Sequence, residues 1–180
     1  MLSSLEDCET IIREENVHDD EKTIKPIYDL GYAGGTKFIH KNKFIKMCTG
    51  LGPYTEDPAF PNIVAGDKAG LNEVRAVNAV TSALIKLNMK NLRTTLACSI
   101  RIKGRCFIIY ALSPIAKDTI VYGRGFGSTD KAVNAGQFEE VKEKINMLGD
   151  YFNLEPHTFK GTELVTAADV EVHIAKDGRM

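Results

Sequence analysis

The sequence has no tryptophan, no long apolar run and no excess of charge of either sign. Its 23 lysines and arginines stand against 24 aspartates and glutamates, so the whole chain has no field that attracts nucleic acid or an anionic membrane. No segment approaches the roughly 18 apolar residues of a membrane span, and the acidic N-terminus lacks the marks of a signal peptide. We therefore expect a cytoplasmic protein with no membrane insertion and no DNA partner.

Cysteine is sparse, and no C-x-x-C pair occurs among Cys8, Cys48, Cys98 and Cys106. Three of the four lie in apolar, strand-like runs, which is typical of reduced thiols in the core of a cytosolic protein. The four histidines show no ligand spacing with these cysteines. The sequence therefore predicts no metal site, and no cofactor is expected.

A chain of 180 residues predicts one domain of ordinary size. Residues 1–25 are rich in acids, and either a short helix over Leu5–Arg13 or a mobile acidic arm would fit them. Residues 26–180 would form the folded domain. Within it, three glycines in residues 31–35 predict a tight turn, and residues 50–66 predict an irregular loop.

The clearest period in the sequence is helical and covers residues 67–89, where apolar side chains recur at three- and four-residue spacing. Glu73 falls inside the apolar arc of this helix, so its carboxylate should point inward and need a partner. A second amphipathic helix is predicted over residues 135–149, with Gly149 as its stop and a solvated acidic outer face. The apolar positions of the two helices are Val74, Val77, Val80, Leu84 and Leu87, then Phe138, Val141, Ile145, Leu148 and Phe152.

Three β-rich segments predict a mostly antiparallel sheet, crossed by these helices in an α+β fold. The first segment should be a hairpin with a polar Lys41-Asn42 turn, and the second a hairpin that turns at Gly104. The second strand of that hairpin is apolar on both faces and should be central. The segments are residues 37–48, 94–112 and 118–122. A further strand over residues 170–174 alternates apolar and polar side chains and should form half of a hairpin that turns at Asp177-Gly178.

Four motifs resemble, in the same order, those of the Clu domain, the central domain of the clustered-mitochondria proteins. They are a K-A…E-V-R-A-V-N-A helix, an R-T-T-L-A-C strand, a Y-G pair and an E-L pair followed by D-G-R. The resemblance covers residues from about 30 to 180 and makes the chain look like a Clu domain truncated at its C-terminal end. The residues that carry it include Lys68, Glu73, Asn78, Arg93, Tyr122, Gly123, Asp177, Gly178 and Arg179.

The chain departs from the family pattern at Asn72, where the family usually has histidine, and at Glu171-Val172, where it often has Lys-Gly. By resemblance, full-length members are cytoplasmic proteins that bind messenger RNAs for mitochondrial proteins and influence where mitochondria lie. The resemblance therefore implies a non-enzymatic module, with messenger RNA or protein partners bound through flanking regions.

Two kinds of binding site remain open from the residues themselves. A basic patch could bind RNA, although the solvated edges of two hairpins would show the same pattern. The sequence also lacks the aromatic and basic stripe that single-stranded RNA platforms use. The patch would consist of Lys37, Lys41, Lys43, Lys46, Lys103 and Arg105.

The other candidate is a phosphotransferase-like nucleotide site, active or degenerate. Lys46 on a strand and Glu73 on the following helix would match the lysine–glutamate pair in the small lobe of protein kinases. The glycines of residues 31–35 do not fit G-x-G-x-x-G. Asp169 would then be the catalytic or metal-binding acid, but Ile174 stands where the kinase catalytic loop has asparagine. No catalytic residue is assigned, and the chain is not expected to be an enzyme.

Overall fold

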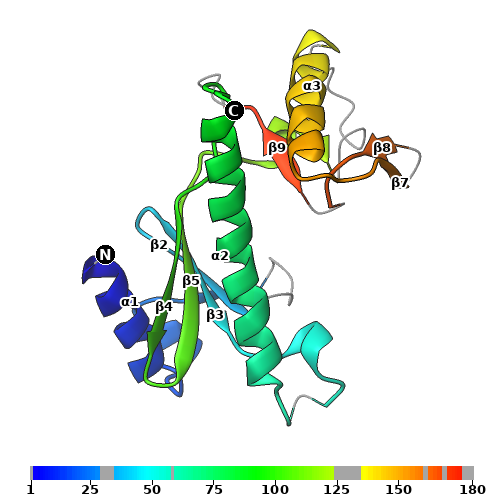
Figure 1. Ribbon diagram of the computed structural model, residues 1–180. Coiled ribbons are helices and arrows are strands. Elements are labelled where there is room, and N and C mark those ends of the chain that lie inside the picture. The colour runs from blue at the N-terminus through cyan, green and yellow to red at the C-terminus, as the bar shows by residue number, and fades with distance from the viewer. Residues whose placement is uncertain are drawn as a thin grey trace. The chain divides into compact units, whose positions relative to one another are not determined.

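The computed structural model describes residues 2–28, 35–57, 59–123, 135–159, 162–167 and 170–175 (Figure 1). The chain divides into two compact units. Unit 1 comprises Met1–Asn78 and Thr95–Leu112, and unit 2 comprises Ala79–Thr94 and Ser113–Met180. The long helix α2 (Ile63–Lys86) begins in unit 1 and ends in unit 2. Short 3-10 turns are η1 (Asp19–Glu21), η2 (Gly52–Tyr54) and η3 (Lys117–Thr119).

Unit 1 is built on a five-stranded antiparallel sheet in the order β1-β2-β3-β5-β4. Both predicted hairpins are confirmed, and their tight turns use left-handed backbone at Lys41 (φ 54), Lys103 (φ 48) and Gly104 (φ 76). β5 lies between β3 and β4, as its continuous apolar run predicts. The strands are β1 (Pro26–Ile27), β2 (Thr36–His40), β3 (Lys43–Cys48), β4 (Ala97–Ile102) and β5 (Arg105–Ala111).

Successive side chains of these strands point to opposite faces of the sheet, and each face is covered by a different helix (Figure 1). We call these the α1 face and the α2 face. The α1 face is mainly apolar, with Lys43 as a buried exception, whereas the α2 face mixes apolar and polar side chains. The buried α1-face cluster is Cys8, Ile11, Ile24, Phe38, Ile45, Met47, Phe107 and Ile109. The α2-face cluster is Cys48, Cys106 and Ile108, packed with Leu71, Val74 and Tyr110.

The acidic N-terminal residues form a helix, α1 (Leu2–Arg13), and not an extended arm. Its Cys8 and Ile11 are buried in the α1-face cluster. Its Asp7 is also buried and forms an ion pair with Lys43 of β3. Residues near the N-terminus therefore contribute to the core of unit 1. The many charged residues of this segment do not indicate that role in the sequence.

The predicted helix over residues 67–89 exists as α2, displaced towards the N-terminus. It begins at Ile63 because the Asn62 side chain accepts a hydrogen bond from the backbone N–H of Ala65 (3.1 Å), as an N-cap does. It ends at Lys86, where Asn88 adopts left-handed backbone (φ 54) and the N–H of Met89 bonds back to the carbonyl of Leu84 (2.9 Å). That pattern is a Schellman C-cap with asparagine in place of glycine.

Unit 2 contains a second α/β core around α3 (Ala135–Tyr151). The predicted apolar positions of α3 are confirmed, since Val141, Ile145 and Leu148 are buried and Phe138 and Phe152 pack beside them. Gly149 does not stop the helix; it packs against Val165, where an added Cβ would come within 3.1 Å of that side chain. The strands are β6 (Ile120–Gly123), β7 (His157–Phe159), β8 (Thr162–Leu164) and β9 (Glu171–His173).

The prediction that residues 118–122 join the main sheet is wrong. β6 pairs with β9 in a separate two-stranded antiparallel sheet, and β7 pairs with β8 in another. An alternating apolar pattern identifies a strand but does not identify its partner. Gly123 (φ +101) fixes this pairing, because a Cβ there would lie 1.9 Å from the carbonyl oxygen of Val170.

Several predicted features lie outside the described residues: the glycine turn of residues 31–34, Asp169 and the Asp177-Gly178-Arg179 motif. Within the described ranges, no helix combines the length and the apolar character that crossing a membrane requires.

Candidate functional site

The most distinctive polar arrangement of unit 1 is the ion pair of Lys46 and Glu73 on the α2 face. The ammonium of Lys46, on β3, donates to both carboxylate oxygens of Glu73, on α2, at 2.7 Å each. The Lys46 side chain is 11% exposed and that of Glu73 is 34% exposed. The prediction that Glu73 turns inward to a partner is therefore confirmed, and the pair opens to solvent on the carboxylate side.

Two more side chains complete this site. The hydroxyl of Tyr110, on β5, donates to Glu73 Oε2 at 2.7 Å, and burial followed by this bond raises the pKa of Tyr110. Lys37, on β2, stands directly opposite Lys46 in the strand register and is buried. Burial, and then the charge of Lys46, lower the pKa of Lys37. Two lysines therefore stand beside the Glu73 carboxylate.

Tyr54, from the turn η2, belongs to the same neighbourhood. Burial raises its pKa, and the negative charge of Glu73 raises it further. The site therefore combines side chains from β2, β3, β5, α2 and the loop before α2, which are far apart in the sequence. It brings together two lysine ammoniums, one carboxylate and two tyrosine hydroxyls.

A second buried lysine pair on β3 provides a comparison. Lys43 pairs with Asp7 on the α1 face, and their side chains are 10% and 7% exposed. Both members of that pair are closed off from solvent, with His40 Nε2 at 3.7 Å from Asp7 as a further neighbour. The Lys43–Asp7 pair therefore links α1 to the sheet. The Lys46–Glu73 pair is more exposed to solvent, so it is the pair that a ligand can reach.

The predicted basic patch does not form one surface. Lys43 and Lys46 point to opposite faces of the sheet, and each is paired with a carboxylate. Arg105 bonds Glu15 of the α1 region at 2.7 Å. Lys41 and Lys103 lie at the tips of two different hairpins and are exposed.

The residues of the four resemblance motifs fall in both units. Lys68, Asn78 and Arg93 are exposed, and Glu73 is part of the candidate site. Tyr122 is buried in β6, where its hydroxyl accepts a hydrogen bond from the backbone N–H of Val165 (3.2 Å). The Tyr122-Gly123 pair therefore has a structural role, since Gly123 sets the approach of β9.

A family model described as CLU, clustered mitochondria, matches residues 3–180. The chain belongs to the CLU family. This membership connects it with the clustering of mitochondria, and the match begins within α1. No curated protein and no solved structure matches this CLU chain.

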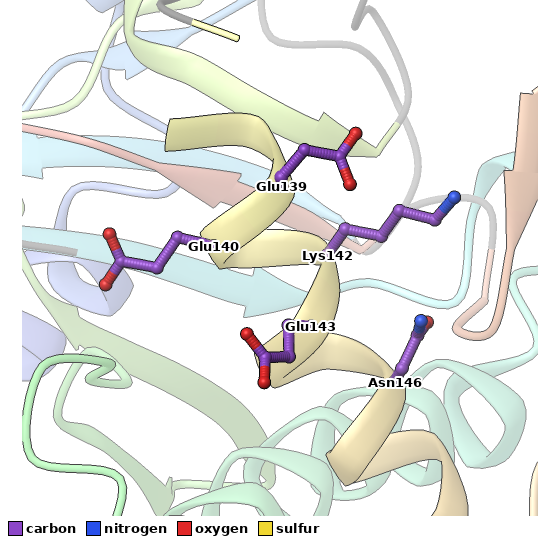
Figure 2. Close-up of a pocket in the computed structure, with 5 residues that line it drawn as sticks. All are labelled: Glu139, Glu140, Lys142, Glu143 and Asn146. Carbon is purple, nitrogen blue, oxygen red and sulfur yellow. The ribbon is translucent and has the colours of Figure 1, made fainter. Parts of the chain in front are cut away.

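A shallow hollow runs along the acidic side of α3 in unit 2 (Figure 2). All its lining side chains come from that one helix and spread away from each other, so no groups converge on a ligand. This face of α3 is therefore a solvated surface of the CLU chain. The lining residues are Glu139, Glu140, Lys142, Glu143 and Asn146.

The sequence of this CLU chain identifies Lys46 and Glu73 as a pair, but it does not place three of their neighbours at the same site. Lys37 was assigned to an RNA patch, although a two-residue turn at Lys41-Asn42 already implies that residues 37 and 46 stand opposite each other. Tyr110 could be found only from the pairing of β5 with β3, which the sequence does not contain. Tyr54 lies in a loop without any period.

Proposed function

We propose that this CLU chain is a non-enzymatic binding module of a cytoplasmic protein involved in the distribution of mitochondria, and that its Lys46–Glu73 site binds the phosphates of a nucleotide. Family membership supports the first part. One observation carries the second: a buried strand lysine held at 2.7 Å by both oxygens of a helix carboxylate that solvent can reach.

The geometry suits a phosphate for electrostatic reasons. Lys37 and Lys46 are adjacent lysines with little exposure, and both feel the charge of the Glu73 carboxylate. A phosphate at this place would accept hydrogen bonds from the Lys46 ammonium, and charge-assisted hydrogen bonds of this kind are stronger than neutral ones. In protein kinases, a lysine on the third strand and a glutamate on the following helix form a similar pair, and the lysine contacts nucleotide phosphates.

Catalysis is not part of the proposal. The kinase reaction needs an acid that accepts the substrate proton and an asparagine that binds the second magnesium ion. Ile174 occupies the position at which that asparagine would follow Asp169. The proposal is therefore a nucleotide-binding module of the pseudoenzyme type.

The experiment is a thermal-shift titration with ATP and magnesium. Binding at one hundred times Kd should stabilise the fold by about 2.7 kcal/mol, which raises Tm by several degrees. The double variant Lys46→Met, Glu73→Gln should lose the shift. It removes both charges together, so neither member of the pair is left buried without the other.

The chain provides a matched control in Lys43→Met, Asp7→Asn, which removes the lysine pair on the opposite face and should keep the shift. The proposal fails if the wild-type protein gives no shift with millimolar nucleotide. It also fails if both double variants give the same shift as the wild type.

A second candidate function is the binding of a protein partner. Four large apolar side chains are exposed in the loop after β3 and the first turn of α2, and an exposed apolar group of this kind often marks an interaction surface. Messenger RNA has less support, since only Lys41 and Lys103 of the six basic candidates are exposed at hairpin tips, and the Lys41 ammonium itself lies 4.0 Å from Asp7 Oδ1. The apolar residues are Leu51, Phe60, Ile63 and Val64.

Cell experiments separate these partners. Phe60→Ser with Val64→Ser should disturb mitochondrial distribution in cells that depend on the protein carrying this chain. The control Ile39→Ser with Leu96→Ser changes exposed apolar residues elsewhere on unit 1 and should not. An RNA mobility shift at low salt that Lys41→Gln with Lys103→Gln abolishes would instead favour messenger RNA.

A further inference from the structure

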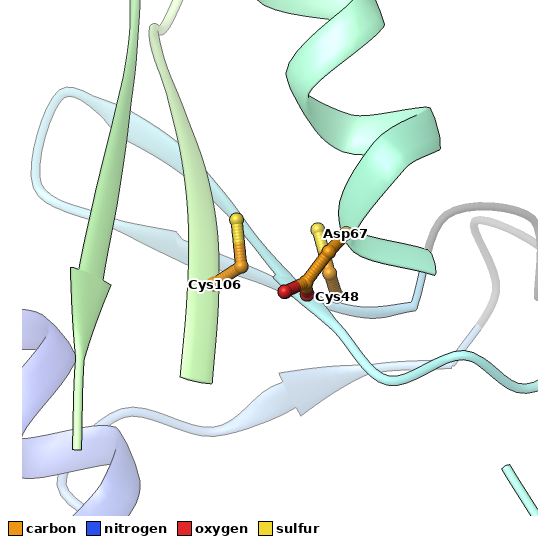
Figure 3. A group of neighbouring side chains, drawn as sticks. All are labelled: Cys48, Asp67 and Cys106. Carbon is orange, nitrogen blue, oxygen red and sulfur yellow. The ribbon is translucent and has the colours of Figure 1, made fainter. Parts of the chain in front are cut away.

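Three side chains with metal-binding donors meet on the α2 face, two residues along β3 from Lys46 (Figure 3). They are Cys48 at the end of β3, Cys106 on β5 and Asp67 on the second turn of α2. The two cysteines stand directly opposite each other in the β3–β5 register. One donor atom from each residue lies within 4.8 Å of the other two, and all three residues are buried.

Two glycines bring the helix close enough for this meeting. A Cβ on Gly70 would lie 2.6 Å from Cys48 Sγ, and a Cβ on Gly66 would lie 2.6 Å from the backbone nitrogen of Gly50. Any larger residue at either position would push α2 away from the sheet. The close approach at Gly66 and Gly70 therefore brings the Asp67 carboxylate next to the two thiols.

Only one of the two Asp67 carboxylate oxygens has a hydrogen-bonding partner among the described residues. Asp67 Oδ2 accepts from Arg101 Nη2 at 2.7 Å, and the side chain is 10% exposed. Its Oδ1 is buried and has no hydrogen-bond partner among the described residues. A buried carboxylate oxygen without a partner is costly, so its position next to two thiols needs an explanation.

We infer that Cys48 Sγ, Cys106 Sγ and Asp67 Oδ1 form a binding site for a thiophilic divalent cation, with zinc as the first choice. Thiolate and carboxylate oxygen are both zinc ligands, and three protein ligands with solvent as the fourth are a known arrangement. Ligands around tetrahedral zinc stand roughly 3.5 Å apart, so small side-chain rotations close the set.

The charges of the site support this inference. Two thiolates and one carboxylate exceed a divalent cation by one negative charge, and the guanidinium of Arg101 offsets it. Arg101 also fixes the carboxylate through Oδ2 and leaves Oδ1 without a hydrogen-bond partner, so Oδ1 is the oxygen available to a cation. Zinc ligation uses the thiolate form of cysteine, so zinc binding must release the protons of both thiols to the solvent.

The first experiment uses the unaltered chain. Zinc added to reduced protein should bind at one ion per chain, release protons to a weak buffer and slow the alkylation of Cys48 and Cys106. Cys98 is a cysteine outside the cluster, and its alkylation rate should not change. Cobalt in place of zinc should give the charge-transfer absorption of thiolate ligation.

Variants test the assignment of the ligands. Cys48→Ser or Cys106→Ser should weaken zinc binding by at least roughly 10–100-fold, whereas Cys98→Ser should leave it unchanged. The inference is overturned if reduced wild-type protein binds no zinc, or if zinc protects neither cysteine. Isolation of a Cys48–Cys106 disulfide that persists in reducing buffer would overturn it as well, since the pair would then be a redox pair.

Discussion

Glu73→Gln tests the physical basis of the candidate site, because it removes one charge of the Lys46–Glu73 pair and leaves the shape almost unchanged. Lys46 would remain 11% exposed beside Lys37, without the carboxylate to which it donates two hydrogen bonds. Tyr110 could still donate to the amide oxygen that replaces Glu73 Oε2. The loss of stability should therefore report the electrostatic contribution of the pair.

The size of that loss follows from the burial of the two partners. Breaking a fully buried pair costs about 3–5 kcal/mol, and breaking an exposed one costs about 0–1 kcal/mol. Since Glu73 is 34% exposed and Lys46 is mostly buried, we expect Glu73→Gln to lower the free energy of unfolding by about 2 kcal/mol. Glu15→Gln is the control, because Glu15 bonds Arg105 at the same 2.7 Å but with both side chains about a third exposed.

Urea denaturation followed by far-ultraviolet circular dichroism measures both variants, with the slope m as the check that the same surface unfolds. A cycle with Lys46→Met and the double variant isolates the coupling between the two residues. The reasoning would be refuted if Glu73→Gln changed stability no more than Glu15→Gln did, or if the cycle gave a coupling near zero.

Three further predictions concern the sheet and its two helices. The pKa of Lys37 is lowered, so the unfolded chain holds more protons than the folded one between that pKa and about 10.4. Stability should therefore rise with pH across this window, and urea midpoints of Lys37→Met should lack the rise. Gly70→Ala should destabilise the chain by about 1–3 kcal/mol in urea denaturation, because its methyl group would meet Cys48 Sγ at 2.6 Å; a neutral effect would contradict the close packing of α2. Asp7→Asn should cost roughly 3–5 kcal/mol by leaving Lys43 buried without its carboxylate, and hydrogen exchange should show α1 opening first.

Most of the fold of unit 1 could be predicted from the sequence. The hairpins at Lys41-Asn42 and Gly104 were predicted because a tight turn between two apolar runs is a local signal. The two-stranded pairing of β6 with β9 was missed, since it joins segments far apart in the chain. Helix boundaries shifted because the caps, Asn62 and Asn88, lie outside the apolar period.

The candidate site was predictable only in part, for a related reason. Glu73 stood out because a carboxylate inside an apolar arc violates the period of its helix. Tyr110 did not stand out, because a tyrosine in an apolar strand fits the pattern. Asp67 and the two thiols gave no spacing that indicates a metal, since the register of β3 with β5 and the close approach of α2 bring them together.

Isothermal titration of the chain with ATP and magnesium tests the central claim most directly. The account predicts saturable binding at one site per chain, loss of that binding in Lys46→Met, Glu73→Gln, and its retention in Lys43→Met, Asp7→Asn. Absence of binding to the wild-type chain would contradict the account, as would equal affinities for the wild type and the Lys46→Met, Glu73→Gln variant.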